Sequence, residues 1–185
     1  ALEKETTFDQ QQLKKALSDG KVVVVSSWIK YCYSWASQMK VLKEAKKDSK
    51  RIVFTNGCFD LLHVGHITYL EEAKKLGDRL VVALNADSSV KKLKGAKRPI
   101  NKLKERAKQI AALDSVDWVT SFTEDTPLKL IKELEPDVLV KGKDYKVKDI
   151  AGSKEVLSKG GQVKTIKLVK GISTTNLIRK IKNLD

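Results

Sequence analysis

Residues 51–66 read RIVFTNGCFDLLHVGH, an apolar run, then a polar turn, then two histidines three positions apart. The run at 51–55 is short and rich in β-branched and aromatic residues, which predicts a buried strand. A helical pattern of apolar residues follows over 64–76. This stretch therefore predicts a strand, a polar loop and a helix, which is the first unit of an α/β fold.

The same alternation continues to the end of the chain. Strands are predicted at 51–55, 79–85, 116–122, 137–140 and 162–168, and helices at 64–76, 101–113, 127–134, 153–158 and 174–182. Near-continuous apolar strands alternating with amphipathic helices indicate a parallel sheet covered by helices. Such sheets bind ligands at the carboxyl ends of their strands, so we expect the site in the loops after residues 55, 85, 122, 140 and 168.

Two residues are expected to mark ends of the predicted helices. Gly77 follows the first predicted helix, where a left-handed C-terminal cap is expected. Pro127 follows Thr126, which predicts a cap residue and a proline in the first helical position.

The composition is that of a globular protein with a cationic surface. Of 185 residues, 41% are hydrophobic and 32% charged, and 37 Lys and Arg against 23 Asp and Glu give a net charge of +14. This excess favours anionic partners but does not choose among nucleotides, sugar phosphates, nucleic acid and anionic membranes. Because the lysines are spread along the whole chain, a solvated surface explains most of them.

We expect a soluble, cytoplasmic protein without a membrane segment. Two cysteines, Cys32 and Cys58, are too few for a disulfide framework in a chain of this size. The most apolar stretch, 22–33, is interrupted by Lys30 and is shorter than the roughly 20 residues of a membrane span. It also lies behind acidic residues and too far from the start for a signal peptide.

Two regions differ in character. Residues 51–185 hold the regular alternation and form the predicted functional domain. Residues 1–50 form an N-terminal extension of unknown role, helical and rich in aromatic residues. We expect its aromatic cluster to pack in the core or against a second subunit; its members are Trp28, Tyr31, Tyr33 and Trp35.

The chain's only histidines, His63 and His66, flank Gly65 at a predicted helix start. Their spacing places both imidazoles on one side, and the free N–H groups of a helix N-terminus suit a polyanion. Packing histidines are one alternative. Zinc held by these histidines with Cys58 and Asp60 is another, although no second ligand pair occurs elsewhere. We favour phosphate binding, with Gly65 leaving room for the phosphate.

A second candidate anion site lies at residues 171–176, GISTTN, which lead into the last predicted helix. Ser173 is a good N-cap, and the hydroxyl and N–H groups of Thr174 and Thr175 are expected to face an anion. The chain contains neither GxxxxGK[ST] nor GxGxxG, so P-loop enzymes and dinucleotide-binding dehydrogenases are not supported.

These motifs resemble the HxGH nucleotidyltransferase superfamily, which includes cytidylyltransferases, adenylyltransferases and, more distantly, class I aminoacyl-tRNA synthetases. The chain most resembles the adenylyltransferases that make ADP-activated heptose from D-glycero-β-D-manno-heptose 1-phosphate. The resemblance covers about 51–182 and is carried by TNGCFDLLHVGH, LGDRLVVALNADSSVKKLKGAKRPI, VDWVTSFTEDTP, PDVLVKGKDY and GISTTNLIRKI. It implies a Rossmann-like, doubly wound parallel sheet.

The resemblance implies attack by a sugar-phosphate oxygen on the α-phosphorus of ATP, with release of pyrophosphate and with Mg²⁺ bound to the ATP. The expected catalytic residues are His63, His66, Lys94 and Arg106. The expected nucleotide-binding residues are Asn56, Gly57, Cys58, Phe59, Gly65, Gly142, Asp144, Tyr145, Ser173, Thr174 and Thr175. The expected substrate-binding residues are Asp60, Asp87, Lys92 and Arg98, the first two as sugar contacts or as support for them. Lys92 and Lys94 are expected in a loop after the second strand.

Partners follow from the same resemblance. In many bacteria this domain follows a sugar kinase in one longer chain, and residues 1–50 are too short for that kinase, so we expect a separate kinase. We also expect a homodimer and a role in a heptose route to lipopolysaccharide. The alternatives are a cytidylyltransferase acting on glycerol 3-phosphate or a similar alcohol phosphate, and a basic nucleic-acid-binding protein without activity; we do not expect nucleic acid as a partner.

Overall fold

The computed structural model describes residues 39, 43, 45–143, 145–167, 169 and 171–184. The predicted N-terminal extension therefore lies largely outside the described residues, and its aromatic cluster lies wholly outside them. Of the part before Arg51, Met39 and Ala45 pack against one of the two hydrophobic cores. In the described part of the chain, no helix combines the length and the apolar character needed to cross a membrane.

A five-stranded, all-parallel sheet forms the centre of the molecule, which confirms the predicted fold class. Its order is β3-β2-β1-β4-β5. The first strand, β1, therefore lies in the middle, β2 and β3 extend the sheet to one edge, and β4 and β5 extend it to the other. The strands are β1 (Ile52–Gly57), β2 (Arg79–Asn85), β3 (Trp118–Phe122), β4 (Val138–Gly142) and β5 (Gln162–Ile166). The strand order reverses between β1 and β4, which is where ligands of such sheets bind.

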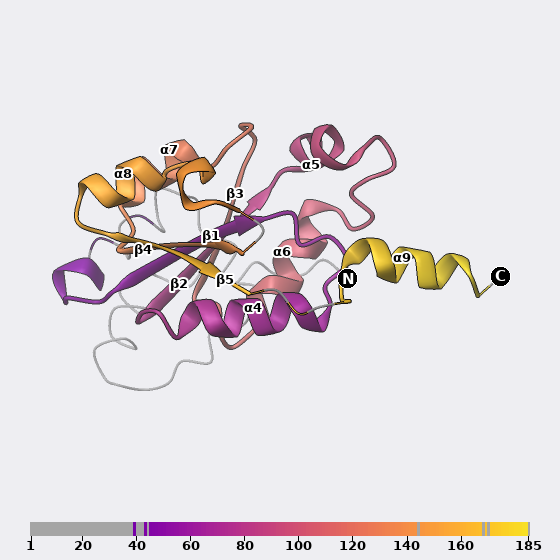
Figure 1. The fold of residues 1–185 in the computed structure, drawn as a ribbon, viewed down its shortest axis with the longest axis horizontal. Coiled ribbons are helices and arrows are strands. Elements are labelled where there is room, and N and C mark those ends of the chain that lie inside the picture. Colours follow the sequence, from indigo (N-terminus) through magenta and orange to yellow (C-terminus); the bar gives the residue numbers. More distant parts are fainter. Residues whose placement is uncertain are drawn as a thin grey trace, which may run out of the picture.

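Helices cover both faces of this sheet (Figure 1). The α-helices are α4 (Val64–Lys74), α5 (Asp87–Lys94), α6 (Leu103–Ala111), α7 (Leu128–Leu134), α8 (Ser153–Ser158) and α9 (Thr174–Lys182). A 3-10 turn, η1, spans Val147–Asp149. Helices α4 and α6 lie on one face, α7 and α8 lie on the other, and α9 extends away from the sheet.

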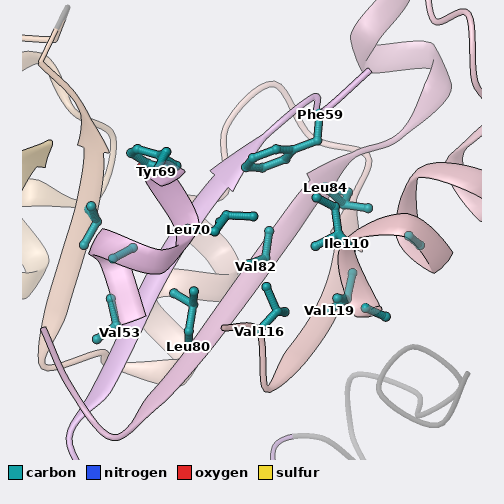
Figure 2. Close-up of a cluster of buried hydrophobic side chains, with 14 of the residues drawn as sticks. Val53, Phe59, Tyr69, Leu70, Leu80, Val82, Leu84, Ile110, Val116 and Val119 are labelled. Carbon is teal, nitrogen blue, oxygen red and sulfur yellow. The ribbon is translucent and has the colours of Figure 1, made fainter. Parts of the chain in front are cut away.

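The two cores follow from the alternation of side chains along each strand. In β1, Ile52 and Phe54 are buried under α7 and α8, while Val53 is buried under α4. Figure 2 shows the second of these cores, with Leu70 of α4 and Ile110 of α6 pointing toward the strands. Because both faces of the central strands are covered, their sequences are apolar at almost every position.

The structure corrects two predictions about the ends of helices. The backbone of Gly77 is not left-handed, and the C-cap residue of α4 is Lys75 in a right-handed conformation. Gly77 instead permits a close approach, because a Cβ there would lie 2.7 Å from the carbonyl oxygen of Arg51. Pro127 occupies the N-cap of α7 rather than its first turn, which begins at Leu128.

A third correction concerns Lys92 and Lys94, which were predicted in a loop and lie in helix α5. This helix was not predicted because its sequence, DSSVKKLK, has only two apolar residues, too few for a visible stripe. Its last turn carries three lysines, which a helix C-terminus accommodates well.

Candidate active site

The carboxyl ends of β1, β2 and β4 open into a cavity of about 620 Å³. Its wall is completed by the loop after β1, the start of α4, the end of α5 and the start of α9. Segments more than a hundred residues apart in the sequence thus meet at the edge of the sheet that the fold class predicts. A second cavity, of about 650 Å³, lies at the amino end of the strands and is lined by Arg51, Asp137 and Gln162 among others.

His63 and His66 lie together in the wall of the first cavity. His63 is the N-cap residue of α4, and His66 lies in its first turn. Their rings stack with centroids 3.7 Å apart and an angle of 13° between the planes. The predicted placement of both imidazoles on one side of the helix start is therefore confirmed.

Three buried polar atoms in this wall have no hydrogen-bond partner among the described residues: Asn56 Oδ1, His63 Nδ1 and His66 Nδ1. They are the only buried side-chain atoms of this kind in the part of the chain that the structure describes. Buried polar groups in proteins are nearly always hydrogen-bonded, so a cluster of three without partners is expected where a polar ligand binds. All three residues line the cavity.

Burial also controls the charge of the two imidazoles. Loss of hydration, with a smaller contribution from neighbouring His63, lowers the pKa of His66 to about 4. Burial likewise lowers the pKa of His63. Both rings are therefore neutral near pH 7, and each keeps one N–H that can be donated to an anion.

The start of α9 forms the opposite part of the wall. Ser173 is its N-cap, and the Ser173 hydroxyl accepts a hydrogen bond of 3.1 Å from the N–H of Asn176, as predicted. Thr175 lines the cavity and is exposed. The Thr174 hydroxyl, which was expected to face an anion, donates to the carbonyl oxygen of Asp60 at 3.0 Å. This bond ties α9 to the loop after β1.

Asp60 is almost fully buried and holds the segment after α5. Its carboxylate accepts hydrogen bonds from Arg98 Nε at 2.5 Å and from the backbone N–H groups of Ile100 and Asn101 at 2.9–3.0 Å. Burial acts to raise the pKa of Asp60, but the hydrogen bonds from Asn101, Ile100 and Arg98 together hold it below its ordinary value. Asp60 is therefore an ionised support for this loop, and it holds the side chain of Arg98, which lines the cavity with it.

Arg106, on α6, is completely buried. Its guanidinium donates to the carbonyl oxygens of Asn101 (3.0 Å), Cys58 (2.7 Å) and Asn85 (2.9 Å). It also forms an ion pair of 2.8 Å with Asp87. Neither Arg106 nor Asp87 belongs to the cavity lining. Arg106 holds the backbone of the surrounding loops, and Asp87 pairs with its guanidinium.

The other predicted cations differ in position. Lys94 lines the cavity and is exposed. Lys92 lies outside the lining and pairs with Asp125 at 3.4 Å, with both side chains largely exposed. Such an exposed pair contributes little to stability.

The end of β4 brings further groups to the cavity. Gly142 and Tyr145 both line it, and Tyr145 is 48% exposed. Lys141 donates to the carbonyl oxygen of Asn56 at 3.0 Å and lies 5.1 Å above the Tyr145 ring. Asp144, the remaining residue predicted here, lies outside the described residues.

The loop after β1 is shaped by its small and aromatic residues. The Phe59 ring packs edge-on against His66, with centroids 5.2 Å apart, and a Cβ on Gly57 would lie 2.9 Å from the Phe59 ring. A Cβ on Gly65 would lie 3.2 Å from the His63 ring, so this glycine gives room to the imidazole. Burial raises the pKa of the Cys58 thiol. Among the described residues, no three His, Cys, Asp or Glu side chains are grouped so as to hold a metal ion.

Several lining residues were not predicted from the sequence. They are Tyr69, Asn85, Leu93, Asp125, Thr126, Pro127, Lys141, Asp149, Ile150, Ala151, Val169 and Ile172. The group at 125–127 follows β3, whose loop was already expected at the site, so its position in the fold was the available signal. The group at 149–151 begins with the last residue of η1, a short turn without a signature in the sequence.

Comparisons with known proteins agree with this architecture. Residues 54–180 match the family model described as cytidylyltransferase-like. The chain is 58% identical over 151 residues to the protein named bifunctional protein HldE of Haemophilus influenzae (strain PittEE), and 56% identical over 151 residues to the protein of the same name from Pasteurella multocida (strain Pm70). Each match covers 82% of this chain and 32% of the relative, so the chain spans about a third of the length of these curated relatives.

Among solved structures, the fold is similar to the lipopolysaccharide core biosynthesis protein from Thermoplasma volcanium GSS1. The TM-score is 0.54 at 32% identity, and the match covers 66% of this chain and 99% of that one. The curated matches are longer than the 135 residues from 51 to 185. Their similarity therefore includes residues before Arg51, the start of the predicted functional domain.

Proposed function

Because the chain belongs to the cytidylyltransferase-like family of nucleotidyltransferases, we propose that it transfers AMP from ATP to a heptose 1-phosphate, giving ADP-heptose and pyrophosphate. One observation carries the proposal. The three buried polar atoms without partners, on Asn56, His63 and His66, lie in the wall that the start of α9 completes. The imidazoles and the N–H groups of two helix N-termini around one cavity can donate to a triphosphate, while Asn56 Oδ1, which only accepts, suits a hydroxyl or N–H of the nucleotide.

The reaction needs alignment more than it needs a reactive side chain. An oxygen of the sugar phosphate forms a bond to the α-phosphorus of ATP as the bond from that phosphorus to the bridging oxygen of the β-phosphate breaks. The electron pair leaves with pyrophosphate, and no covalent enzyme intermediate forms. The protein's part is to hold two polyanions in line and to donate hydrogen bonds to the oxygens on which charge grows.

The neutral imidazoles of His63 and His66 suit the second task. Each neutral ring has one N–H to donate. The buried Nδ1 atom of each ring has no hydrogen-bond partner among the described residues. We assign His66 to the α- and β-phosphates, the backbone at 56–59 to the length of the nucleotide, and the first turn of α9, from Ser173 to Thr175, to the β- and γ-phosphates. These segments follow one another along the chain in the order that the resemblance to the adenylyltransferases implies.

Cations from α5 and the loop behind it complete the charge balance. Lys94 and Arg98 line the cavity, and we assign them to the phosphate of the sugar substrate. Mg²⁺ is expected to enter with ATP. When bound, it would withdraw charge from the phosphate oxygens.

The choice of sugar and base rests on the resemblance to the ADP-heptose-forming adenylyltransferases. It is supported by 58% identity to proteins named bifunctional protein HldE and by a structural neighbour named for lipopolysaccharide core biosynthesis. A role in making a precursor of lipopolysaccharide follows from the same proposal. The predicted homodimer and separate kinase stay predictions.

A pyrophosphate-release assay tests the proposal. The purified chain is given ATP or CTP, each with either anomer of heptose 1-phosphate or with glycerol 3-phosphate. We expect turnover only with ATP and one heptose 1-phosphate anomer. Turnover with CTP and glycerol 3-phosphate would replace the proposal with the cytidylyltransferase alternative. Salt-sensitive binding to mixed-sequence DNA or RNA, without turnover of any nucleotide, would favour a nucleic-acid-binding protein.

The role of His66 has its own test. We expect His66→Ala to abolish turnover and to retain the fold, because the side chain lies in the wall of an open cavity. Lys75→Ala, an exposed substitution just past the same helix, is the matched control and should have normal activity. Near-normal turnover in His66→Ala would overturn the assignment.

A further inference from the structure

Arg106 makes four hydrogen bonds around the site, yet it does not line the cavity. Its guanidinium is 0% exposed, and it donates to three backbone carbonyls and one carboxylate. These acceptors belong to the loop after β1, the end of β2, the start of α5 and the residue two before α6. One side chain therefore fixes three loops around the site.

The hydrogen bond from Arg106 to the Cys58 carbonyl oxygen lies next to the residue that contacts His66. At 2.7 Å it is the shortest of the four, and it fixes the peptide that links Cys58 to Phe59. Phe59 has a left-handed backbone, with φ of 47°, which a non-glycine residue adopts only when its surroundings hold it there. The Phe59 ring then packs edge-on against His66. A contiguous set of contacts thus runs from Arg106 to the imidazole.

The Phe59 ring also helps to keep His66 away from water. Phe59 is 6% exposed, and it packs within the hydrophobic core on the α4 side of the sheet, with its ring visible at the carboxyl end of β1 in Figure 2. Burial is the largest cause of the lowered pKa of His66. Movement of this ring would therefore let water reach the imidazole.

We propose that Arg106 is a positioning residue that fixes the Cys58 peptide and thereby holds the Phe59 ring against His66. The inference rests on the proposed nucleotidyl transfer, in which His66 contacts the phosphates. Lysine cannot replace the guanidinium here, because one ammonium group cannot reach acceptors that diverge around a planar fork. The positive charge alone is thus not enough.

The test is Arg106→Lys in the full chain, compared with Arg79→Lys. Arg79 is a partly exposed arginine that pairs with Asp117, away from the cavity, and serves as the matched control. Pyrophosphate release gives kcat and the KM values for ATP and for the sugar phosphate, and NMR titration gives the pKa of each imidazole. The chain has two histidines, so the signals are readily assigned.

In Arg106→Lys we expect kcat to fall roughly ten- to hundred-fold, as for a small displacement of a reacting group, with little change in KM for ATP. We expect the pKa of His66 to rise from about 4 toward its ordinary 6.5. A fall in the melting temperature alone, with both kcat and the pKa unchanged, would reduce Arg106 to a structural role. A raised KM for the sugar phosphate with unchanged kcat would make it a substrate contact.

Phe59→Leu covers the case in which Arg106→Lys does not fold. It keeps the Arg106 bonds, shortens the side chain and removes the ring contact, so it should also raise the pKa of His66 and lower kcat. An unchanged His66 pKa in Phe59→Leu would overturn the inference. The NMR titration needs no substrate, so a wild-type chain that is inactive on heptose 1-phosphate refutes the proposed function and leaves this test in force.

Discussion

Acidification should destabilise the protein through His66 in particular. The pKa of this imidazole is about 4 in the folded chain against an ordinary value of 6.5, so the unfolded chain takes up the proton first as the pH falls. The stability that depends on neutral His66 is therefore fully present above pH 6.5 and is lost as the pH falls from 6.5 to 4. His66→Gln keeps a polar side chain that cannot titrate.

The difference between a pKa of about 4 in the folded chain and 6.5 in the unfolded chain corresponds to about 3 kcal/mol of unfolding free energy. About 2 kcal/mol of this is lost between pH 7 and pH 5. Urea unfolding of the wild type and of His66→Gln at pH 7, 6 and 5 measures this quantity. Asp60 and the other carboxyl groups are common to both proteins, so the difference between the two pH dependences isolates His66. Equal losses of stability in the two proteins would refute the placement of this imidazole in a site shielded from water.

Three substitutions test contacts elsewhere in the fold. Gly77→Ala should destabilise the chain by about 1–3 kcal/mol in urea unfolding, because its Cβ would meet the carbonyl oxygen of Arg51 at 2.7 Å; a neutral effect would contradict this close approach. Thr174→Val should cost about 1 kcal/mol and raise KM for ATP, since α9 loses its bond to the Asp60 carbonyl; an unchanged KM would show that the bond does not position α9. Asp60→Asn should cost about 1.5–3 kcal/mol and lower kcat, because Arg98 loses its ionic partner, and normal turnover would count against Asp60 as the support of this loop.

The sheet could be predicted from the sequence because its strands are buried on both faces. In β2 every residue after Arg79 is buried, and the predicted bounds 79–85 match those of the strand. Helices α8 and α9 also begin and end as predicted, the second because Ser173 caps it. At these places the local sequence preferences and the tertiary packing favour the same structure, so the sequence pattern was sufficient to predict the bounds of these elements.

The rest depends on contacts between distant segments, which a single sequence does not display. Helix α5 has no apolar stripe, and the identity of Gly77 is set by the backbone of Arg51, the residue just before β1. Arg106 was expected to be catalytic, and Asp60 was expected to contact the sugar or to support such contacts. In the structure both side chains bond to distant parts of the chain. Asp60 accepts from Arg98, 38 residues away, and Arg106 donates to the carbonyl oxygen of Cys58, 48 residues away.

The buried guanidinium of Arg106 also bears on how the chain folds. Its acceptors come from segments that meet only after β1, β2 and α6 have docked, and a guanidinium buried before then would lack partners at a large cost in free energy. Partly folded forms that contain the α6 side of the core are thereby disfavoured. We expect the loops of the site and the core beneath them to gain protection from hydrogen exchange in one cooperative step, so that a population with a formed sheet and an unformed site does not accumulate.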